Sequence, residues 1–365
     1  MKICFILGTR PEIIKLSPLI RECIKRHLLF FIIHTNQHYS ETMDNIFFRE
    51  LNLPNPKYNL NIGSDSHGAQ TGKMLMGIEK ILEKESPHVV FVQGDTNSVL
   101  AGALAASKMQ KTLLAHVESG LRSYDRTMPE EVNRIITDHI SNILLAPTTI
   151  QKKILIREGI SQKNVYIVGN TIVDAIFQNL KEVKKHAQAF KNLEIVPKKY
   201  AMLTMHRPSN VESKENLTEI LDSVKIIIKQ RNIPIIFPVH PRTKKMLEYF
   251  RLNIPMGLRL IEPIGYLEML QIIKNALFVL TDSGGIQEEA CILRVPCITL
   301  RRNTERPETI EVGGNILAGQ KKSSIVSSVN MMLKKKANWR NPFGNGKSGE
   351  KIIKIITSLC RPTKN

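Results

Sequence analysis

The amino-acid sequence predicts an α/β protein made of two doubly wound, Rossmann-like domains. Short apolar runs alternate with helix-length amphipathic stretches along the 365 residues, and strands that alternate with helices form parallel sheets. This length is too great for one hydrophobic core. The alternation also occurs in two series, separated by a Lys-rich polar segment at residues 181–199. We therefore expect a domain boundary between Asn170 and Tyr200.

The apolar runs and the amphipathic stretches give the expected elements in order. In the first half, strands are expected at Lys2–Gly8, Leu29–His34, Val89–Gln93, Thr112–Glu118 and Ile143–Ala146. In the second half, they are expected at Tyr200–Met205, Ile233–Val239, Leu258–Ile261, Leu277–Thr281 and Pro296–Leu300. Helices are expected at Pro11–Arg26, Gln70–Lys84, Ser98–Met109, Glu131–Ser141, Lys214–Arg231, Thr243–Arg251, Tyr266–Asn275 and Gly285–Leu293.

The composition predicts a soluble cytoplasmic protein. Hydrophobic residues make up 42% and charged residues 23% of the chain, which is ordinary for a globular domain. The longest apolar runs are strand-sized and far below the ~20 residues that span a bilayer. The apolar start Met1–Leu7 continues into Gly8 without a small-residue cleavage site, so a buried strand is favoured over a signal sequence. Five scattered cysteines without a CxxC pair predict reduced, mostly buried thiols.

The formal net charge of +19 first suggests a nucleic-acid partner. However, residues 321–365 hold eleven Lys and Arg and one acid, so about half of the excess lies in this tail. Aromatic residues are only 5%, and no nucleic-acid motif is present. We therefore expect a solvated basic surface and no nucleic-acid partner, with a polyanionic substrate as the functional alternative.

A glycine-started helix in the second half predicts a phosphorylated ligand. Ser283, Gly284 and Gly285 follow the apolar run 276–280 and precede a helix-like stretch. The first N–H groups of a helix have no partner within it, and the helix dipole adds partial positive charge there. Glycine also allows a phosphate to approach the backbone closely.

Further candidates lie at the carboxyl ends of the predicted strands, where open α/β sheets bind ligands. Arg10 and Lys15 follow the first strand and could also be ordinary surface cations. Asp95 follows another strand and could instead cap the next helix. Glu118 ends a buried strand, where an acid is costly unless it is paired or used. His116, inside that strand, is better explained as a core histidine with satisfied hydrogen bonds.

The remaining candidates also have a structural alternative. Glu130 begins a helix, where an acid suits the dipole, and Arg134 could pair with it one turn later. His206 ends a strand in the second half and could grip a diphosphate or simply form a turn. Glu289 is suitably placed for ribose hydroxyls or is a helix-surface acid, and Arg306 lies near another strand end.

Several signatures are absent from the sequence. There is no HExxH and no His/Cys cluster, which predicts that no metal is bound. There is no P-loop and no GxSxG. The GxGxxG fingerprint is also absent, which argues against a nicotinamide cofactor.

With these residues in hand, the chain closely resembles the UDP-N-acetylglucosamine 2-epimerase family over nearly its whole length. The matching motifs occur in order at Gly8–Glu12, Gly94–Asn97, His116–Arg122, Pro129–Arg134, His206-Arg207, Asp282–Glu289 and Glu305–Glu308. The resemblance implies two Rossmann-like domains around a deep cleft, as in B-type glycosyltransferases. It also implies that the helix at Glu350–Leu359 crosses back to the first domain. The expected domains are then 1–172 plus 350–365, and 173–349.

The resemblance further implies an activity, a site and a partner. The activity is the reversible inversion of UDP-GlcNAc at C2 to UDP-ManNAc, through elimination of UDP to 2-acetamidoglucal and re-addition, with no cofactor. The matching catalytic residues are Asp95, Glu118, Glu130 and His206. The matching diphosphate contacts are Arg10, Lys15, Ser283, Gly284, Gly285 and Arg306, with Glu289 on the ribose. A homodimer is expected from the family.

The resemblance leaves several alternatives open. Gln37, His38 and Gln70 resemble part of a second UDP-GlcNAc site that activates some bacterial members. Residues 120–126 also resemble relatives that act on a UDP-linked diacetamido uronic acid, whose carboxylate could meet Arg122 or Arg126. A hydrolysing epimerase, a glycosyltransferase of the same fold and a UDP-sugar sensor without turnover are further alternatives.

Overall fold

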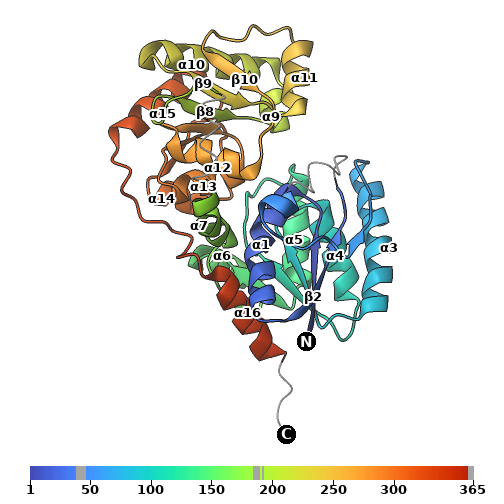
Figure 1. The fold of residues 1–365 in the computed structure, drawn as a ribbon. Coiled ribbons are helices and arrows are strands. Elements are labelled where there is room, and N and C mark those ends of the chain that lie inside the picture. Colours follow the sequence, from blue (N-terminus) through green and yellow to red (C-terminus); the bar gives the residue numbers. More distant parts are fainter. Residues whose placement is uncertain (38–46, 184–189, 191–192, 361–365) are drawn as a thin grey trace. The chain divides into compact units, whose positions relative to one another are not determined.

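The computed structural model describes residues 1–37, 47–183, 190 and 193–360. His38 of the expected second nucleotide-sugar site therefore lies outside the described residues. The contacts between Cα atoms divide the chain into two compact units (Figure 1). Unit 1 comprises Met1–Gln178 and Phe343–Asn365, and unit 2 comprises Asn179–Pro342. The boundaries that we expected from the sequence, at 172/173 and 349/350, lie within a few residues of these divisions.

Unit 1 is built on one parallel sheet. Its described strands are β1 (Lys2–Leu7), β2 (Leu29–His34), β3 (Tyr58–Asn59), β4 (Val89–Gln93), β5 (Leu113–Val117), β6 (Ile143–Ala146) and β7 (Val165–Ile167). Their order is β3-β2-β1-β4-β5-β6-β7, with every pair parallel. The strand order reverses between β1 and β4, and such a switch point is where ligands bind in open α/β sheets.

Helices connect these strands and cover the sheet. They are α1 (Arg10–Lys25), α3 (His67–Glu85), α4 (Asn97–Ser107), α5 (Pro129–Ile140), α6 (Thr149–Arg157), α7 (Thr171–Val183) and α16 (Ser348–Leu359). The last of these lies in unit 1 and packs against α1 (Figure 1). Strand β1 is apolar and buried from Ile3 to Leu7 because helices bury both faces of a parallel sheet.

Unit 2 repeats the same topology in a second parallel sheet. Among the described residues its strands are β8 (Ala201–Thr204), β9 (Ile235–Pro238), β10 (Leu258–Ile261), β11 (Val279–Thr281), β12 (Cys297–Thr299) and β13 (Asn315–Leu317). The order β10-β9-β8-β11-β12-β13 places the switch point between β8 and β11. The predicted fold class, two doubly wound Rossmann-like domains, is therefore confirmed.

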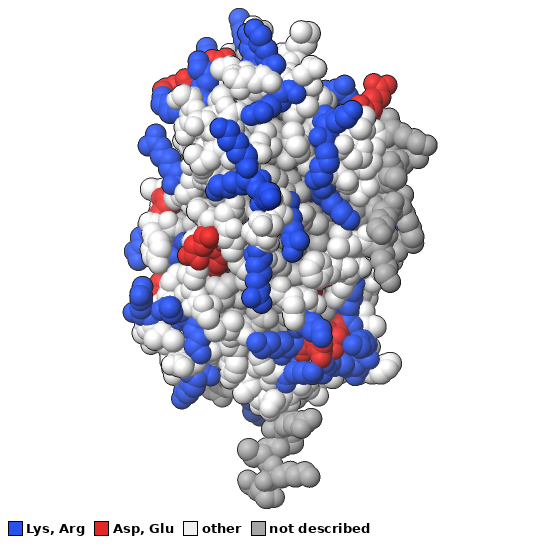
Figure 2. Space-filling model, turned by 90° about the vertical axis from the view of Figure 1, so that its left-hand side faces the viewer, with Lys and Arg blue, Asp and Glu red and all other residues white. Residues whose placement is uncertain are grey.

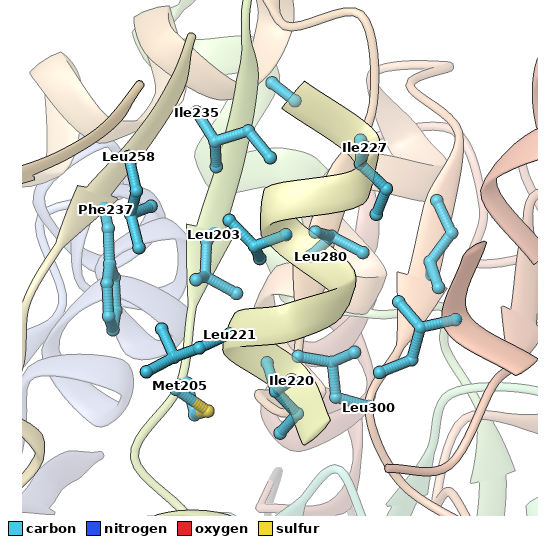
Figure 3. Close-up of a cluster of buried hydrophobic side chains, with 14 of the residues drawn as sticks. Leu203, Met205, Ile220, Leu221, Ile227, Ile235, Phe237, Leu258, Leu280 and Leu300 are labelled. Atoms are coloured by element: carbon cyan, nitrogen blue, oxygen red, sulfur yellow. The ribbon is translucent and has the colours of Figure 1, made fainter. Parts of the chain in front are cut away.

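The helices of unit 2 follow from local sequence signals and from a shared core. They are α9 (Pro208–Val211), α10 (Lys214–Arg231), α11 (Pro241–Tyr249), α12 (Tyr266–Asn275), α13 (Gly284–Ile292), α14 (Pro307–Glu311) and α15 (Lys322–Lys334). Helix α10 begins where the Ser213 hydroxyl accepts a bond from Asn216 N, and it ends at Asn232 in the left-handed region. Its buried face packs on the sheet through Ile220, Leu221 and Ile227 (Figure 3).

The remaining features are the absence of a membrane-spanning helix among the described residues and the distribution of surface charge. No helix in the described part of the chain is both long enough and apolar enough to cross a membrane. Figure 2 shows Lys and Arg side chains spread over the face that it draws, with few acids among them. The expected absence of a nucleic-acid partner stays a prediction.

Candidate functional site

The switch point of unit 1 is tied together by a buried acid. Glu12, in the first turn of α1, accepts hydrogen bonds from Gly8 N at 2.5 Å and Thr9 N at 3.2 Å. The Thr96 hydroxyl, beyond β4, also donates to this carboxyl. Burial raises the pKa of Glu12 to about 7, although these hydrogen bonds act in the opposite direction. The acid thus joins the ends of β1 and β4 and fixes the turn that carries Asp95.

Glu118 is the most enclosed of the candidate carboxylates. Lys15 Nζ lies 2.6 Å and 2.8 Å from its two carboxylate oxygens, and the Gln93 side-chain amide also donates to it. Glu118 and Lys15 are both buried, and a buried charge requires such a partner. The resemblance implied that Lys15 contacts the diphosphate. The structure places its ammonium group on Glu118.

The turn that carries Glu118 has a strained backbone. Glu118 has a φ of 70°, in the left-handed region that non-glycine residues rarely adopt. Asp138 of α5 holds the chain on both sides of it. One carboxylate oxygen lies 2.7 Å from His116 Nδ1, and the other accepts from Gly120 N at 3.1 Å and Arg122 Nη1 at 2.7 Å. This buried acid therefore fixes the position of the candidate catalytic carboxylate.

His116 is a core histidine, as the sequence analysis favoured. Its ring nitrogens contact Asp138 Oδ1 at 2.7 Å and the Gly94 carbonyl oxygen at 2.9 Å. Burial acts to raise the pKa of Asp138, but the charges and hydrogen bonds of His116 and Arg122 outweigh it and hold that pKa below its usual value.

Arg122 is fully engaged within unit 1. It contacts Asp138 and the Leu121 carbonyl oxygen, and two of its nitrogens bind the Glu158 carboxylate at 2.8 Å and 2.5 Å. Its side chain is 1% exposed. Four of its N–H groups thus bind acceptors of unit 1, and its burial does not favour contact with a substrate carboxylate. Arg126, in contrast, is exposed.

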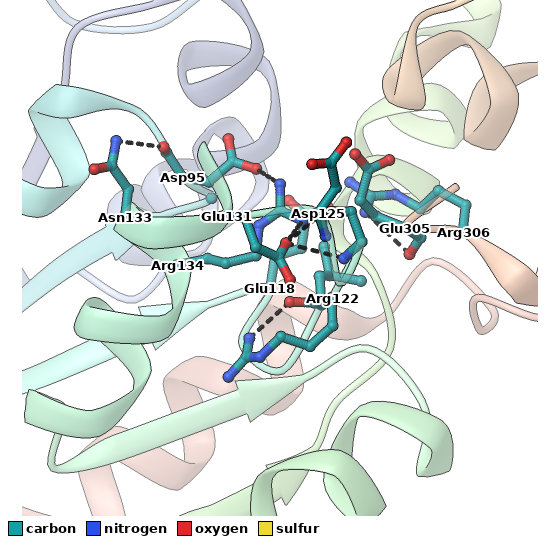
Figure 4. A network of polar contacts seen from close by, with 12 residues as sticks. Asp95, Glu118, Arg122, Asp125, Glu131, Asn133, Arg134, Glu305 and Arg306 are labelled. Atoms are coloured by element: carbon teal, nitrogen blue, oxygen red, sulfur yellow. Dashed lines mark hydrogen bonds and ion pairs between the residues drawn. The ribbon is translucent and has the colours of Figure 1, made fainter. Parts of the chain in front are cut away.

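Asp95 lies at the end of β4 and is more accessible, with its side chain 31% exposed. Arg134 of α5 forms ion pairs with Asp95 and, at 2.9 Å, with Glu131 (Figure 4). Asn133 donates to the Asp95 carbonyl oxygen at 3.0 Å. The pairing of Arg134 with Glu130, which the sequence left open, stays a prediction. Glu130 lies half-buried in the first turn of α5.

Arg10 and the second-site residues also lie in unit 1. Arg10 is half-buried at the start of α1, with its guanidinium 4.8 Å from the centre of the Phe47 ring. Gln70 donates to the Gln37 carbonyl oxygen at 3.1 Å, and the Gln37 side-chain oxygen accepts from the Ser98 hydroxyl at 2.8 Å. The structure thus brings together the two described members of the expected second nucleotide-sugar site.

In unit 2, helix α13 begins without a side-chain cap at Ser283. Gly284 and Gly285 follow, with φ outside the left-handed region. A Cβ atom added at Gly284 would lie 3.7 Å from the nearest atom, on Glu305, and one at Gly285 would lie 3.9 Å from Ser283 Oγ. Neither packing nor backbone conformation requires glycine here. Access of a ligand to the main-chain N–H groups is a physical reason for both glycines.

His206 lies beside this helix start, at the end of the neighbouring strand. Its Nδ1 lies 3.2 Å from Asp282 Oδ1, and its side chain is 40% exposed. Asp282 also accepts from the main-chain nitrogens of His206 and Arg207 and from the Asn210 amide, at 2.9–3.2 Å. Burial acts to raise the pKa of Asp282, yet the hydrogen bonds and charge of His206 keep it below its usual value.

Arg306, another candidate of unit 2, belongs to a buried ionic cluster. Arg306 Nε pairs with Glu288 of α13, and Arg301 binds Glu305 through two nitrogens at 3.0 Å and 2.9 Å. Figure 4 shows Glu305 and Arg306 after β12. Glu289 is buried on α13. The cluster holds the segment after β12 against α13. Arg306 therefore contacts an acid here, whereas the resemblance implies that it contacts the diphosphate.

Sequence reasoning missed the residues that hold the candidate side chains. They are Glu12, Gln93, Glu131, Asp138 and Asp282. Two of them could have been suspected, since Gln93 ends a predicted strand and Asp282 directly follows one. Glu131 and Asp138 sit on α5, and only the fold shows that this helix reaches the end of β5.

Unit 1 carries carboxylates at the carboxyl end of its sheet, and unit 2 carries a helix that begins with two glycines. These two doubly wound parallel sheets define a two-domain α/β enzyme of the B-type glycosyltransferase fold. Residues 22–357 match the model of the UDP-N-acetylglucosamine 2-epimerase family. The chain belongs to this family.

Named relatives agree with this assignment. The chain is 61% identical to the UDP-N-acetylglucosamine 2-epimerase of Methanocaldococcus jannaschii, over 98% of this chain and 99% of the relative. It is 40% identical to the UDP-2,3-diacetamido-2,3-dideoxy-D-glucuronate 2-epimerase of Pseudomonas aeruginosa, over 98% and 100%. A crystal structure of the M. jannaschii enzyme in complex with UDP-GlcNAc and UDP matches with a TM-score of 0.93 and 60% identity, covering 98% of this chain and 100% of that one.

Proposed function

We propose that this protein catalyses the reversible C2 epimerisation of UDP-GlcNAc to UDP-ManNAc without releasing the sugar. The observation that carries this proposal is the 61% identity, over 98% of the chain, to an enzyme with that name. The site chemistry supports it, because unit 1 holds carboxylates at a sheet end and unit 2 presents a helix start suited to a diphosphate.

The chemistry requires elimination rather than direct deprotonation. The C2 proton of UDP-GlcNAc has no adjacent carbonyl to acidify it. A carboxylate takes this proton while the C2–H electrons form the C1=C2 bond, and UDP leaves with the electrons of the C1–O bond. Re-addition of UDP after protonation on the opposite face gives UDP-ManNAc.

We assign roles to the residues as part of this proposal. Asp95, Glu118 and Glu130 serve as the acid and base groups and stabilise positive charge at C1. His206 and the N–H groups at the start of α13 stabilise the negative charge of the departing diphosphate. The contact with Lys15 keeps Glu118 ionised in the free enzyme, as a base requires.

Proton NMR of the purified protein with UDP-GlcNAc in deuterated water, without added metal or cofactor, tests the proposal. UDP-ManNAc with deuterium at C2 is the expected product. Free ManNAc and UDP would instead identify a hydrolysing epimerase. Unchanged substrate would contradict the proposal and direct the same assay to the diacetamido uronic acid nucleotide.

The diacetamido uronic acid nucleotide is the second candidate substrate, because the 40% identical relative is named for it. A uronic acid requires a cation for its carboxylate. Arg122 does not suit this role because its guanidinium is buried against Asp138 and Glu158. Arg126 is exposed and is the remaining candidate from the sequence analysis. Loss of turnover of the uronic substrate alone in Arg126→Ala would support this alternative.

We further propose that the protein acts as a cytoplasmic homodimer. All five cysteines are free thiols, which suits a reducing compartment. Val132 and Ile136 are exposed one turn apart on α5, and such apolar surface suits an interface between copies. Light scattering after gel filtration should give twice the 41.4 kDa chain mass, and a monomer would contradict the dimer.

A further inference from the structure

We propose that Asp282 is a positioning residue, which holds the imidazole of His206 through Nδ1 so that Nε2 serves the leaving diphosphate. This inference rests on the proposed function. It concerns unit 2 alone, where both residues lie at the switch point between β8 and β11.

The contacts of Asp282 show how it could act on His206. The carboxylate is completely buried, and each of its hydrogen-bond partners is a donor. Two of these donors, His206 N and Arg207 N, fix the main chain, while His206 Nδ1 at 3.2 Å fixes the ring. One buried acid therefore sets both the backbone and the side chain of the candidate catalytic histidine.

This contact determines the proton distribution on the ring. An ionised carboxylate accepts hydrogen bonds but does not donate them, so the proton of a neutral His206 ring belongs on Nδ1. In that neutral ring, Nε2, on the far side from the main chain, carries the lone pair; once Nε2 binds a proton, the imidazolium donates to the diphosphate through Nε2, while Asp282 balances its charge through Nδ1. Because the side chain is 40% exposed, Nε2 can meet a ligand, whereas Asp282 cannot.

A purely structural role for Asp282 is the competing explanation. Asn210 allows the two to be separated, because its side chain holds the turn: it donates to Asp282 Oδ2 and to the Leu300 carbonyl oxygen, both at 3.0 Å, and accepts from Gln320 at 3.1 Å. If Asp282 only stabilises the turn, Asn210→Ala should reduce turnover about as much as Asp282→Asn does. If Asp282 acts through His206, the two changes should differ in turnover.

The test combines Asp282→Asn, His206→Ala, the double variant and Asn210→Ala in assays of UDP-GlcNAc turnover. We expect kcat to fall 10- to 100-fold in Asp282→Asn, the usual range for a residue that orients a functional ligand. We expect a smaller fall in Asn210→Ala. In the double variant, kcat should lie within about two-fold of His206→Ala, because both changes remove one function. Multiplicative losses, or unchanged kcat in Asp282→Asn, would overturn the proposal.

A second measurement reads the His206 ring directly in the wild-type protein. In ¹⁵N-histidine-labelled wild-type protein, the His206 signal, identified by its absence in His206→Ala, should report the Nδ1–H tautomer where the ring is neutral. An Nε2–H tautomer would overturn the proposal. If the wild-type protein shows no epimerisation, the proposed function fails, and this spectrum still decides the role of Asp282.

Discussion

Replacement of Gly285 by alanine separates ligand binding from folding at the start of α13. The added methyl would meet no atom closer than 3.9 Å, and the helical backbone accepts alanine. Alanine is favoured over glycine in helices by at most about 1 kcal/mol, so the free energy of unfolding should stay level or rise. For a unit of this size, 1 kcal/mol corresponds to a rise in Tm of about 2–4 °C.

The same methyl should weaken UDP binding, because it occupies space that a phosphate needs to reach the N–H groups. A hydrogen bond to a charged group contributes about 1.5–3 kcal/mol, and loss of one such bond raises Kd roughly 10- to 150-fold. Titration calorimetry with UDP measures this change. Gly72→Ala in α3, which also meets nothing within 4 Å, is the matched control and should leave Kd unchanged.

The outcome decides between two explanations of the glycine pair. A higher or equal Tm together with weaker UDP binding would show that access of a ligand requires these glycines. Unchanged UDP affinity in Gly285→Ala would refute the reasoning. A lower Tm without loss of affinity would show that packing was misjudged.

Three further predictions concern buried acids of unit 1. Glu118→Gln should reduce turnover by at least 10²-fold in the NMR assay and lower the Tm, since Lys15 loses its counter-charge; a wild-type rate would exclude Glu118 from catalysis. Asp138→Asn should destabilise unit 1 by about 1–3 kcal/mol in urea unfolding, because Arg122 and Gly120 N lose a charged buried acceptor while Arg122 keeps its pair with Glu158; an unchanged urea midpoint would contradict this. Burial raises the pKa of Glu12 in the folded protein from its ordinary 4.5 to about 7, so its contribution is complete below pH 4.5 and is lost as pH rises through 7. The free energy of unfolding should therefore fall by up to about 3 kcal/mol over this range relative to Glu12→Gln, and identical pH profiles would refute it.

Much of the fold could be predicted from the sequence because parallel strands are continuous apolar runs. Strands β2, β4, β6 and β10 begin and end at the predicted residues. The strands that were missed, β3, β7 and β13, have two or three residues, too few for a periodic pattern. Helices α6, α7, α9, α14 and α15 were also missed. For α15, the Ser- and Val-containing sequence has modest helix propensity, and the helix is stabilised by packing against α10.

The candidate site was predictable only where a residue follows a predicted strand. Glu118 was favoured because an acid at the end of a buried strand needs a partner or a function, and the structure supplies the partner as Lys15. That pairing joins residues 103 positions apart, so no local pattern could indicate it. The same holds for Asp138, whose contacts with His116 and Arg122 depend on α5 packing beside β5.

At both switch points, a buried acid joins the loops that follow two neighbouring strands. Where strand order reverses, the adjoining loops lead to helices on opposite faces of the sheet, so helix packing alone does not join them. In unit 1, Glu12 accepts from Gly8 after β1 and Thr96 after β4. In unit 2, Asp282 after β11 accepts from the main chain after β8. Burial of such an acid costs free energy, as the raised pKa of Glu12 indicates. Glu12 joins the loops directly beside Asp95, and Asp282 joins them directly beside His206; Asp95 and His206 are candidate catalytic residues. Both acids therefore hold reacting groups in position. We expect their replacement to reduce turnover by more than the accompanying loss of folding stability would explain.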